Sequence, residues 1–190
     1  MRHKDTNKSE AIHQATIELL NEIGFSDISM SKIAKRANVS SSTIYVYFEN
    51  KEDMLGKLYV NVKRKMSLQM LQDVDETTPV QAGFELLMRN LVAFIVDNKD
   101  YFLFLEQFTN SPLIEKLRLE EGAELFKPVF DLIERGKKEN VLKQADTALL
   151  LMYGYFPVAQ LAKEHFKGKL SFHPDTINKM IEMSWDAVKA

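Results

Sequence analysis

The chain has 190 residues, 45% of them hydrophobic and 27% charged, which is the composition of a globular protein with material for one large core or two small ones. It contains no cysteine, which excludes disulfide bonds, a thiol nucleophile and a cysteine-ligated zinc ion. Residues 1–65 hold eleven Lys or Arg against eight Asp or Glu, whereas residues 66–190 hold fourteen against nineteen. This asymmetry suits a nucleic-acid-binding module on an acidic body, although an ordinary scatter of charges gives the same count.

The sequence carries no sign of export or of a membrane span. It begins MRHKDTNKSEA, which lacks the apolar run of a signal peptide, and no window approaches eighteen uninterrupted apolar residues. We therefore expect a cytoplasmic protein with no membrane partner. Seven Gly and five Pro are few for this length, which favours helices joined by short connections.

The first predicted helix covers about residues 8–23, after a short polar arm. Its apolar residues, among them Ile12 and Leu19, recur at helical spacing. Gly24 follows directly, at the place where a helix often ends in a residue of left-handed conformation. Three helices ending at Phe48 would enclose only a small core, so we expect this part of the chain to lean on the helix that follows.

The segment 28–55 has the pattern of a helix-turn-helix. Ser29 is placed to cap a first short helix, Ser40 a second and Asn50 a third, because such side chains accept hydrogen bonds from the free N–H groups at helix starts. Small hydroxyl residues open the second helix, with two tyrosines and a lysine behind them. Hydroxyls can reach base edges or phosphates, and lysine neutralises phosphates. The segment therefore predicts DNA binding.

Beyond residue 50 the pattern stays helical. The helix that starts at Lys51 is long enough to leave a small N-terminal domain and enter a second one. Residues 110–112 predict a break, and Gly122 and Pro128 predict a bend or a split in the helix that follows. Asp146 is placed to cap a strongly apolar helix. We expect these helices at residues 51–72, 79–98, 100–108, 113–138, 147–167 and 174–188.

The N-terminal part of the chain, up to about residue 55, resembles the DNA-binding domain of the TetR (tetracycline-repressor) family of bacterial transcription regulators. The family pattern is a hydrophobic helix, Gly-Phe, and then a hydroxyl-capped IA..AGVS..T.Y.YF..K..L. Asn38 stands where the family usually has glycine, and because Asn tolerates positive φ better than most residues, we expect the turn to survive. The matching residues are Gly24-Phe25, Ser29, Ile33-Ala34, Ala37-Asn38-Val39-Ser40, Thr43-Ile44-Tyr45, Tyr47-Phe48, Lys51 and Leu55.

The resemblance implies a set of DNA-contacting residues. Two serines at the start of the first short helix would lie near a phosphate strand, and three hydroxyl residues opening the second would face base edges. Two tyrosines and a lysine would contact phosphates, the lysine helped by the dipole of the helix it opens. The alternative for each hydroxyl is a cap or a solvated side chain. The set comprises, in that order, Ser29 and Ser31; Ser41, Ser42 and Thr43; Tyr45, Tyr47 and Lys51.

The same resemblance implies an all-α fold with a three-helix helix-turn-helix DNA-binding domain in residues 1–50 and a helical ligand-binding and dimerisation domain in residues 51–190. It also implies a homodimer built on the last two helices. The helix after Asp146 has apolar residues on all sides, which is more apolar surface than a single contact with the core requires. A helix that is simply buried in the core would show the same pattern. A two-fold dimer predicts a palindromic double-stranded operator with half-sites about 34–36 Å apart.

An effector in the second domain would make the protein a ligand-responsive regulator, with repression as the family default. Met and aromatic residues on the predicted helices are candidates to line its site, although such residues at helical spacing are more often plain core. Few charged positions fall among them, so a small apolar or aromatic effector is favoured. The candidates are Met66, Met70, Phe84, Met88, Phe104, Phe108, Phe126, Phe130, Tyr153 and Phe156.

Two other classes of function fit less well. An enzyme would need a catalytic motif, and the four histidines form no HExxH, while no glycine-rich phosphate loop or GxSxG elbow is present. We therefore expect no catalytic residue, no metal and no cofactor; Glu164, His165 and His173 read as polar residues near a helix end rather than as ligands. The alternative within DNA binding is an architectural protein without an inducer, which ligand-dependent release from DNA would separate from a regulator.

Overall fold

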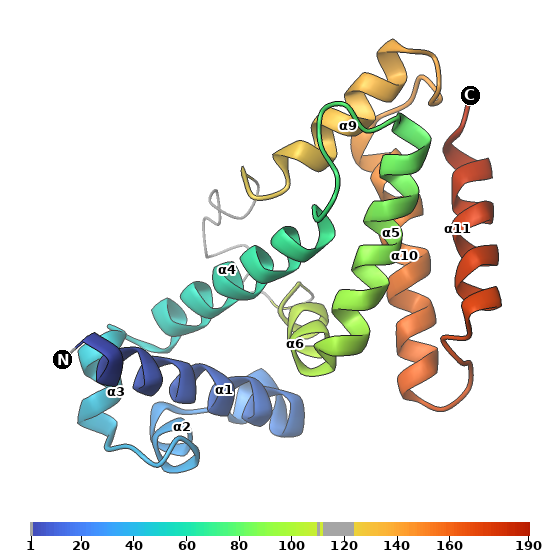
Figure 1. The fold of residues 1–190 in the computed structure, drawn as a ribbon. Helices are drawn as coiled ribbons and strands as arrows, with labels where there is room; N and C mark the ends of the chain where they lie inside the picture. The colour runs from blue at the N-terminus through green and yellow to red at the C-terminus, as the bar shows by residue number, and fades with distance from the viewer. Residues whose placement is uncertain (1, 110, 112–123) are drawn as a thin grey trace. The chain divides into compact units, whose positions relative to one another are not determined.

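The structure is a computed structural model that describes residues 2–109, 111 and 124–190, with side chains from Lys8 onward. Among these residues the fold is all helical, apart from one isolated antiparallel bridge between Leu142 and Lys189. The expected all-α fold is confirmed, while the predictions for Asn110, Pro112 and Gly122 lie outside the described residues. The described helices (Figure 1) are α1 (Arg2–Asp27), α2 (Met30–Arg36), α3 (Ser41–Tyr47), α4 (Lys51–Met70), α5 (Val80–Asp97), α6 (Lys99–Thr109), α9 (Lys127–Lys138), α10 (Thr147–Phe166) and α11 (Pro174–Val188).

Helix α1 departs from the expectation at both ends. It begins at Arg2 rather than near residue 8, and no Gly or Pro before Gly24 opposes its extension. Gly24 has a positive φ of 73°, as expected, but its ψ of 176° is extended rather than left-handed helical. Only glycine adopts that combination readily, and it kinks the backbone within the last turn of α1.

The described chain forms two compact units. Unit 1 comprises the described residues of 1–63 and 98–121, and unit 2 comprises those of 64–97 and 122–190. Helix α4 therefore contributes to unit 1 as far as Lys63 and to unit 2 from Arg64. Helix α6 belongs to unit 1, together with the helix-turn-helix segment.

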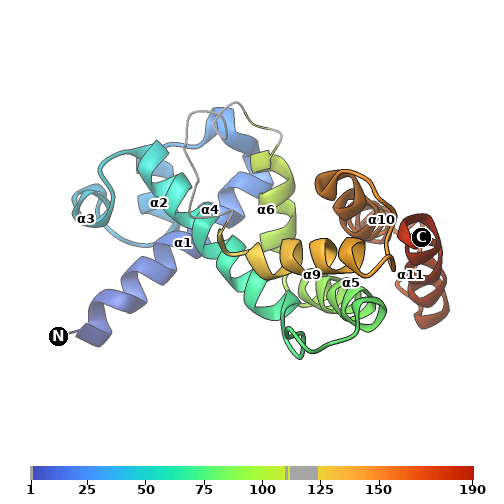
Figure 2. The same ribbon diagram turned by 90° about the horizontal axis from the view of Figure 1, so that it is seen from above.

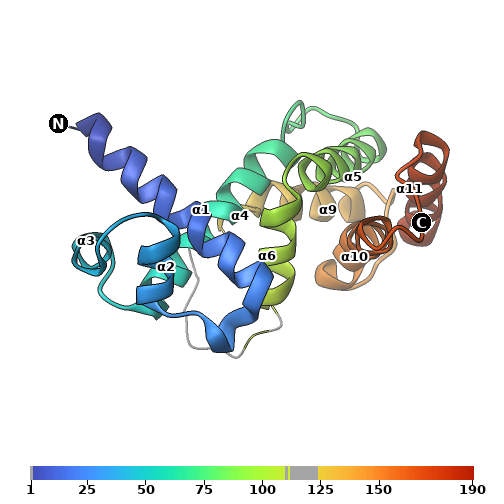
Figure 3. The ribbon, with the colours of Figure 1, turned by 90° about the horizontal axis from the view of Figure 1, so that it is seen from below.

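In unit 1, α6 packs against the C-terminal part of α1, as Figures 2 and 3 both show. The Asn21 side chain donates a hydrogen bond to the carbonyl of Asp100 at 3.0 Å, and Gln107 donates to the Asn21 side-chain oxygen at 3.2 Å. The rings of Phe25 and Phe108 meet edge to face, with centroids 5.7 Å apart. The small N-terminal core is thus covered by a helix that lies far away in the sequence.

The first turns of α4 complete that core. Met54 and Leu55 are fully buried. Thr16 on α1 is also fully buried; its hydroxyl donates to the carbonyl of Ile12 at 2.7 Å and lies 3.8 Å from the Met54 sulfur. The expectation that the three-helix part leans on the next helix is therefore confirmed.

In unit 2, α5 packs against α9, α10 and α11, and α10 and α11 lie side by side (Figures 1 and 2). The Phe84 ring of α5 contacts the Trp185 ring of α11, with centroids 5.6 Å apart. Gly154 of α10 faces the same Phe84 ring. None of the described helices is both long enough and apolar enough to cross a membrane.

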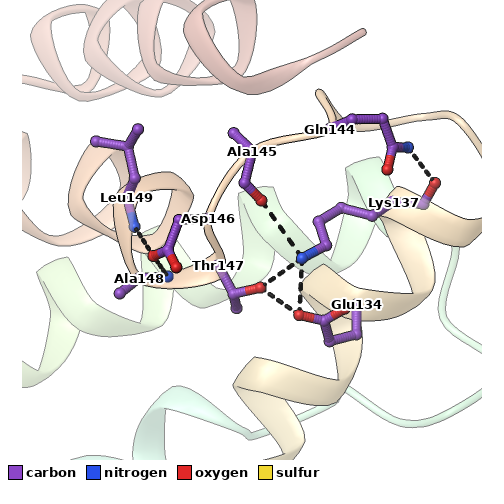
Figure 4. A network of polar contacts seen from close by, with 8 residues as sticks. All are labelled: Glu134, Lys137, Gln144, Ala145, Asp146, Thr147, Ala148 and Leu149. Carbon is purple, nitrogen blue, oxygen red and sulfur yellow. Dashed lines mark hydrogen bonds and ion pairs between the residues drawn. The ribbon is translucent and has the colours of Figure 1, made fainter.

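A polar network fixes the connection between α9 and α10 (Figure 4). The Lys137 ammonium donates to the Glu134 carboxylate at 2.8 Å and to the Thr147 hydroxyl at 2.7 Å, and that hydroxyl donates to the same carboxylate. The hydrogen bonds from Lys137 and Thr147 hold the pKa of Glu134 below its ordinary value. Asp146 caps α10 as predicted, accepting from the N–H groups two and three residues further on.

Candidate nucleic-acid interface

Two short helices, α2 and α3, form the centre of the candidate interface. Ser29 caps α2, since its hydroxyl accepts from the Lys32 N–H at 3.4 Å. Ser40 caps α3, accepting from the Thr43 N–H at 3.1 Å. Both predicted caps are confirmed. They could be predicted from the sequence because a cap depends on residues only three positions apart.

Asn38 forms the turn between the two helices. Its φ is 53°, in the left-handed region that Asn enters more readily than other non-glycine residues. The Val39 N–H donates to the carbonyl of Ala34 at 3.0 Å and so closes the end of α2. The turn therefore forms with asparagine in the position where glycine is usual.

Arg36 fastens α2 to α1. Its guanidinium donates to Glu22 at 2.5 and 2.9 Å and to Glu18 at 3.3 Å. The hydrogen bond from Arg36 holds the pKa of Glu22 below its ordinary value, against an opposing effect of desolvation. The three side chains are partly exposed, so the ion pairs add little stability, and their effect is to orient α2 on α1.

The start of α4 is capped reciprocally. The Asn50 side-chain oxygen accepts from the Asp53 N–H at 2.8 Å, and the Asp53 carboxylate accepts from the Glu49 N–H at 3.0 Å. Desolvation raises the pKa of Asp53, but the hydrogen bonds from Lys57 and from the Glu49 N–H outweigh it and leave the pKa below its ordinary value. Lys51, half-buried, is the first residue of α4, where the aligned peptide dipoles attract anions.

Helix α3 presents one face outward. Ile44 and Phe48 are buried, and the side chains of Tyr45 and Val46 are 57% and 78% exposed. Since each residue turns an α-helix by about 100°, Val46 lies about 200° around α3 from the buried Ile44. The sequence pattern alone gives Val46 no role, because an apolar residue beside core residues is usually assigned to the core. Its exposure in the structure is what identifies it.

The predicted DNA-contacting residues differ in their surroundings. The hydroxyls of Ser42 and Thr43 each lie 2.8 Å from the Ser40 hydroxyl, so part of their hydrogen-bonding capacity is used within α3. The hydroxyls of Ser29 and Ser31 lie 3.1 Å apart. The exposed members of the set are Ser31, Ser41, Ser42 and Tyr45, and the half-buried members are Ser29, Thr43, Tyr47 and Lys51.

The residues predicted to line an effector site are distributed over both units. Phe104 and Phe108 are fully buried in unit 1, where the Phe108 ring stacks on Tyr59 with centroids 4.5 Å apart. Burial raises the pKa of Tyr59. The other candidates lie in unit 2: Met66, Met70, Phe84 and Met88 are buried, Phe126 is half-buried, and Phe130, Tyr153 and Phe156 are exposed.

The described residues include no group of three or more His, Asp or Glu side chains that could hold a metal ion. His165 instead lies against the ring of Phe172, with centroids 4.8 Å apart. Glu164 pairs with Lys167 at 3.1 Å.

Comparison with known proteins assigns both parts of the chain to one group. A family model described as "Bacterial regulatory proteins, tetR family" matches residues 12–58, and another described as "Tetracyclin repressor-like, C-terminal domain" matches residues 79–189. An uncharacterized HTH-type transcriptional regulator of Haemophilus influenzae is 26% identical over 190 residues, which cover 100% of both chains.

Solved structures share the fold over nearly the whole chain. A TetR family transcription regulator from Marinobacter aquaeolei VT8 has a TM-score of 0.89 and 26% identity, covering 100% of this chain and 99% of its own. A TetR-family regulator from Haemophilus influenzae has a TM-score of 0.81 and 26% identity, covering 97% and 98%. The regulator FadR from Bacillus subtilis, solved in complex with stearoyl-CoA, has a TM-score of 0.71 and 20% identity, covering 92% and 96%.

Proposed function

The chain belongs to the TetR family of bacterial regulatory proteins and is a transcriptional regulator, and we propose that it acts as a repressor. In this proposal a homodimer binds a palindromic operator and leaves it when a small apolar or aromatic effector binds. Residues 1–50 would serve DNA binding, and residues 51–190 would serve effector binding and dimerisation. The proposed place of action is the cytoplasm, where the bacterial chromosome lies.

The observation that carries the proposal is the capped helix-turn-helix with an exposed second helix. The outward face of α3 is free of core side chains, so the helix can enter a major groove without unfolding the core behind it. Tyr47 ends α3 and Lys51 opens α4, and we propose that both contact phosphates. Ser29 and Ser31, at the start of α2, would contact the neighbouring phosphate strand.

An apolar stripe on α10 supports the proposed dimer. Leu149, Met152, Tyr153 and Phe156 are spaced along one side of the helix, and each is between 45% and 57% exposed. Met183 on the neighbouring α11 is 64% exposed. Exposed apolar surface on two adjacent helices is typical of an interaction site, and the occupant we propose is a second copy of the chain.

The buried candidates of unit 2 support the proposed effector class. Met66, Met70, Phe84 and Met88 supply only apolar and aromatic atoms, which favour an apolar or aromatic ligand. We assign the exposed Tyr153 and Phe156 to the proposed dimer surface rather than to the effector site. The stearoyl-CoA complex is a property of the Bacillus subtilis protein, and at 20% identity that likeness supports the fold alone.

The test begins with selection of duplexes from a random-sequence library by the purified full-length protein. The selected sites are expected to be palindromic, with half-site centres about 34–36 Å apart. Fatty acids, acyl-CoAs and aromatic compounds are then added one at a time, and one class is expected to lower the affinity. Selective DNA binding that no compound weakens would favour an architectural protein, and a lack of sequence preference would refute the regulator proposed here.

A further inference from the structure

The outward face of α3 lacks the side chains that read bases through paired hydrogen bonds. Arg and Lys pair with guanine, Asn and Gln with adenine, and Asp and Glu accept from cytosine. The sequence of α3, SSTIYVY, contains none of these six residue types. The amide that follows, Asn50, accepts the Asp53 N–H and so serves as the cap of α4.

The hydroxyl groups of α3 are partly engaged as well. The Ser40 hydroxyl accepts the Thr43 N–H and lies 2.8 Å from the hydroxyls of Ser42 and Thr43. These contacts hold the first turn of the helix together. Base discrimination by α3 through hydrogen bonds alone would therefore compete with its own capping network.

Val46 is the most exposed apolar residue on the outward face of α3. At 78% exposure it is the most exposed large apolar side chain among the described residues. It contributes little to the core, and a β-branched residue in a short helix is less favourable than alanine by up to about 0.7 kcal/mol. Neither core packing nor helix propensity favours a valine here, and an apolar contact made on binding would use its exposed side chain.

Thymine is the base whose major-groove edge carries a methyl group, and apolar side chains recognise it by direct contact. We propose that Val46 packs against the C5-methyl group of a thymine in each operator half-site, with the exposed ring of Tyr45 beside it. The inference rests on the proposed docking of α3 in the major groove. In this inference α3 recognises its site partly through an apolar contact, and each half-site must then carry a thymine at one fixed position.

The test replaces thymines of the selected duplex by deoxyuridine, one position at a time, which removes the methyl group and keeps the base pairing. Losing one buried methyl group is expected to weaken binding of the wild-type protein about fourfold, and losing both symmetry-related groups about fifteenfold. The Val46→Ala protein is expected to bind the thymine and deoxyuridine duplexes within about twofold of each other. Leu170→Ala, a substitution at an exposed apolar position in unit 2, is the matched control and should behave as wild type.

Two results would overturn the inference while leaving the proposed function intact. The first is a selected half-site that contains no thymine. The second is a Val46→Ala protein that still binds DNA in a salt-dependent way and whose affinity falls by the same factor as that of the wild type at every deoxyuridine substitution. Failure of the wild-type protein to select any duplex would instead refute DNA binding itself. Because Val46 is largely exposed and alanine is the better helix former, the variant should melt at or slightly above the wild-type temperature, and circular dichroism checks that it is folded.

Discussion

Two helical glycines of unit 2 differ in the space around them, and replacing each by alanine separates core packing from helix propensity. A Cβ atom on Gly136 in α9 would lie 2.6 Å from a Leu142 methyl carbon and 2.7 Å from a Val80 methyl carbon. A Cβ atom on Gly154 in α10 would lie 3.6 Å from the nearest Phe84 ring atom, which is ordinary contact. The same substitution is therefore expected to have opposite effects at the two sites.

The magnitudes follow from two opposing terms. Alanine in place of glycine in a helix interior stabilises by about 1 kcal/mol, and overpacking a core destabilises by about 1–3 kcal/mol. The upper part of that range applies at Gly136, because Leu142 is fully buried and is held by a hydrogen bond to the Gly136 carbonyl and by the bridge to Lys189. We expect Gly136→Ala to lower the free energy of unfolding by about 2 kcal/mol, and Gly154→Ala to raise it by about 0.5–1 kcal/mol.

The assay is urea unfolding followed by tryptophan fluorescence. Trp185, the single tryptophan of the chain, is 9% exposed and contacts Phe84, so its emission reports on the unfolding of unit 2. In a thermal melt, a loss of 2 kcal/mol corresponds to roughly 4–8 °C. Equal shifts of the same sign in the two variants would refute the reasoning, since they would mean that the space around each glycine does not matter.

Three further predictions concern binding, assembly and pH. Tyr47→Ala and Lys51→Ala are each expected to weaken binding to all duplexes by the same factor, and Lys51→Ala, which removes a positive charge, should also flatten the salt dependence in titrations at several salt concentrations; a loss confined to the selected duplex would contradict phosphate contacts. Phe156→Glu places a charge in the exposed stripe of α10 and is expected to convert dimer to monomer in sedimentation velocity, whereas an unchanged dimer rules out that interface. Asp75 accepts hydrogen bonds from the Thr77 hydroxyl, the Thr77 N–H and both donors of Thr78, and these hold its pKa below its ordinary value. The stabilising effect of the Asp75 carboxylate is therefore fully present above the unfolded-state pKa and is lost as the pH falls through the lower folded-state pKa. Asp75→Asn should therefore make the melting temperature fall less steeply with decreasing pH below about pH 4. A melting temperature that falls as steeply in the variant as in the wild type would contradict this prediction.

Many of the expectations that proved correct have short-range causes. Ser29, Ser40 and Asp146 cap their helices because a cap needs only the N–H groups two or three residues further on. Asn38 takes its positive φ for an equally local reason. Gly24 shows where the same logic stops, because the sequence indicates a positive φ but leaves the value of ψ to the packing of the chain that follows.

Most of the helices, three of their caps, the helix-turn-helix and the family pattern could be predicted from the amino-acid sequence, since these depend on residues within about one turn of each other. Which surfaces remain exposed depends on the packing of distant segments. The tertiary structure brings Asn21 to Asp100, 79 residues away, and so places α6 on α1. It also leaves Val46 on the outside of α3 and Phe156 on the outside of α10, although both are apolar. The exposure of a side chain depends on which distant segments pack against its helix. The periodicity of apolar residues within one helix cannot specify which of those segments will cover that helix.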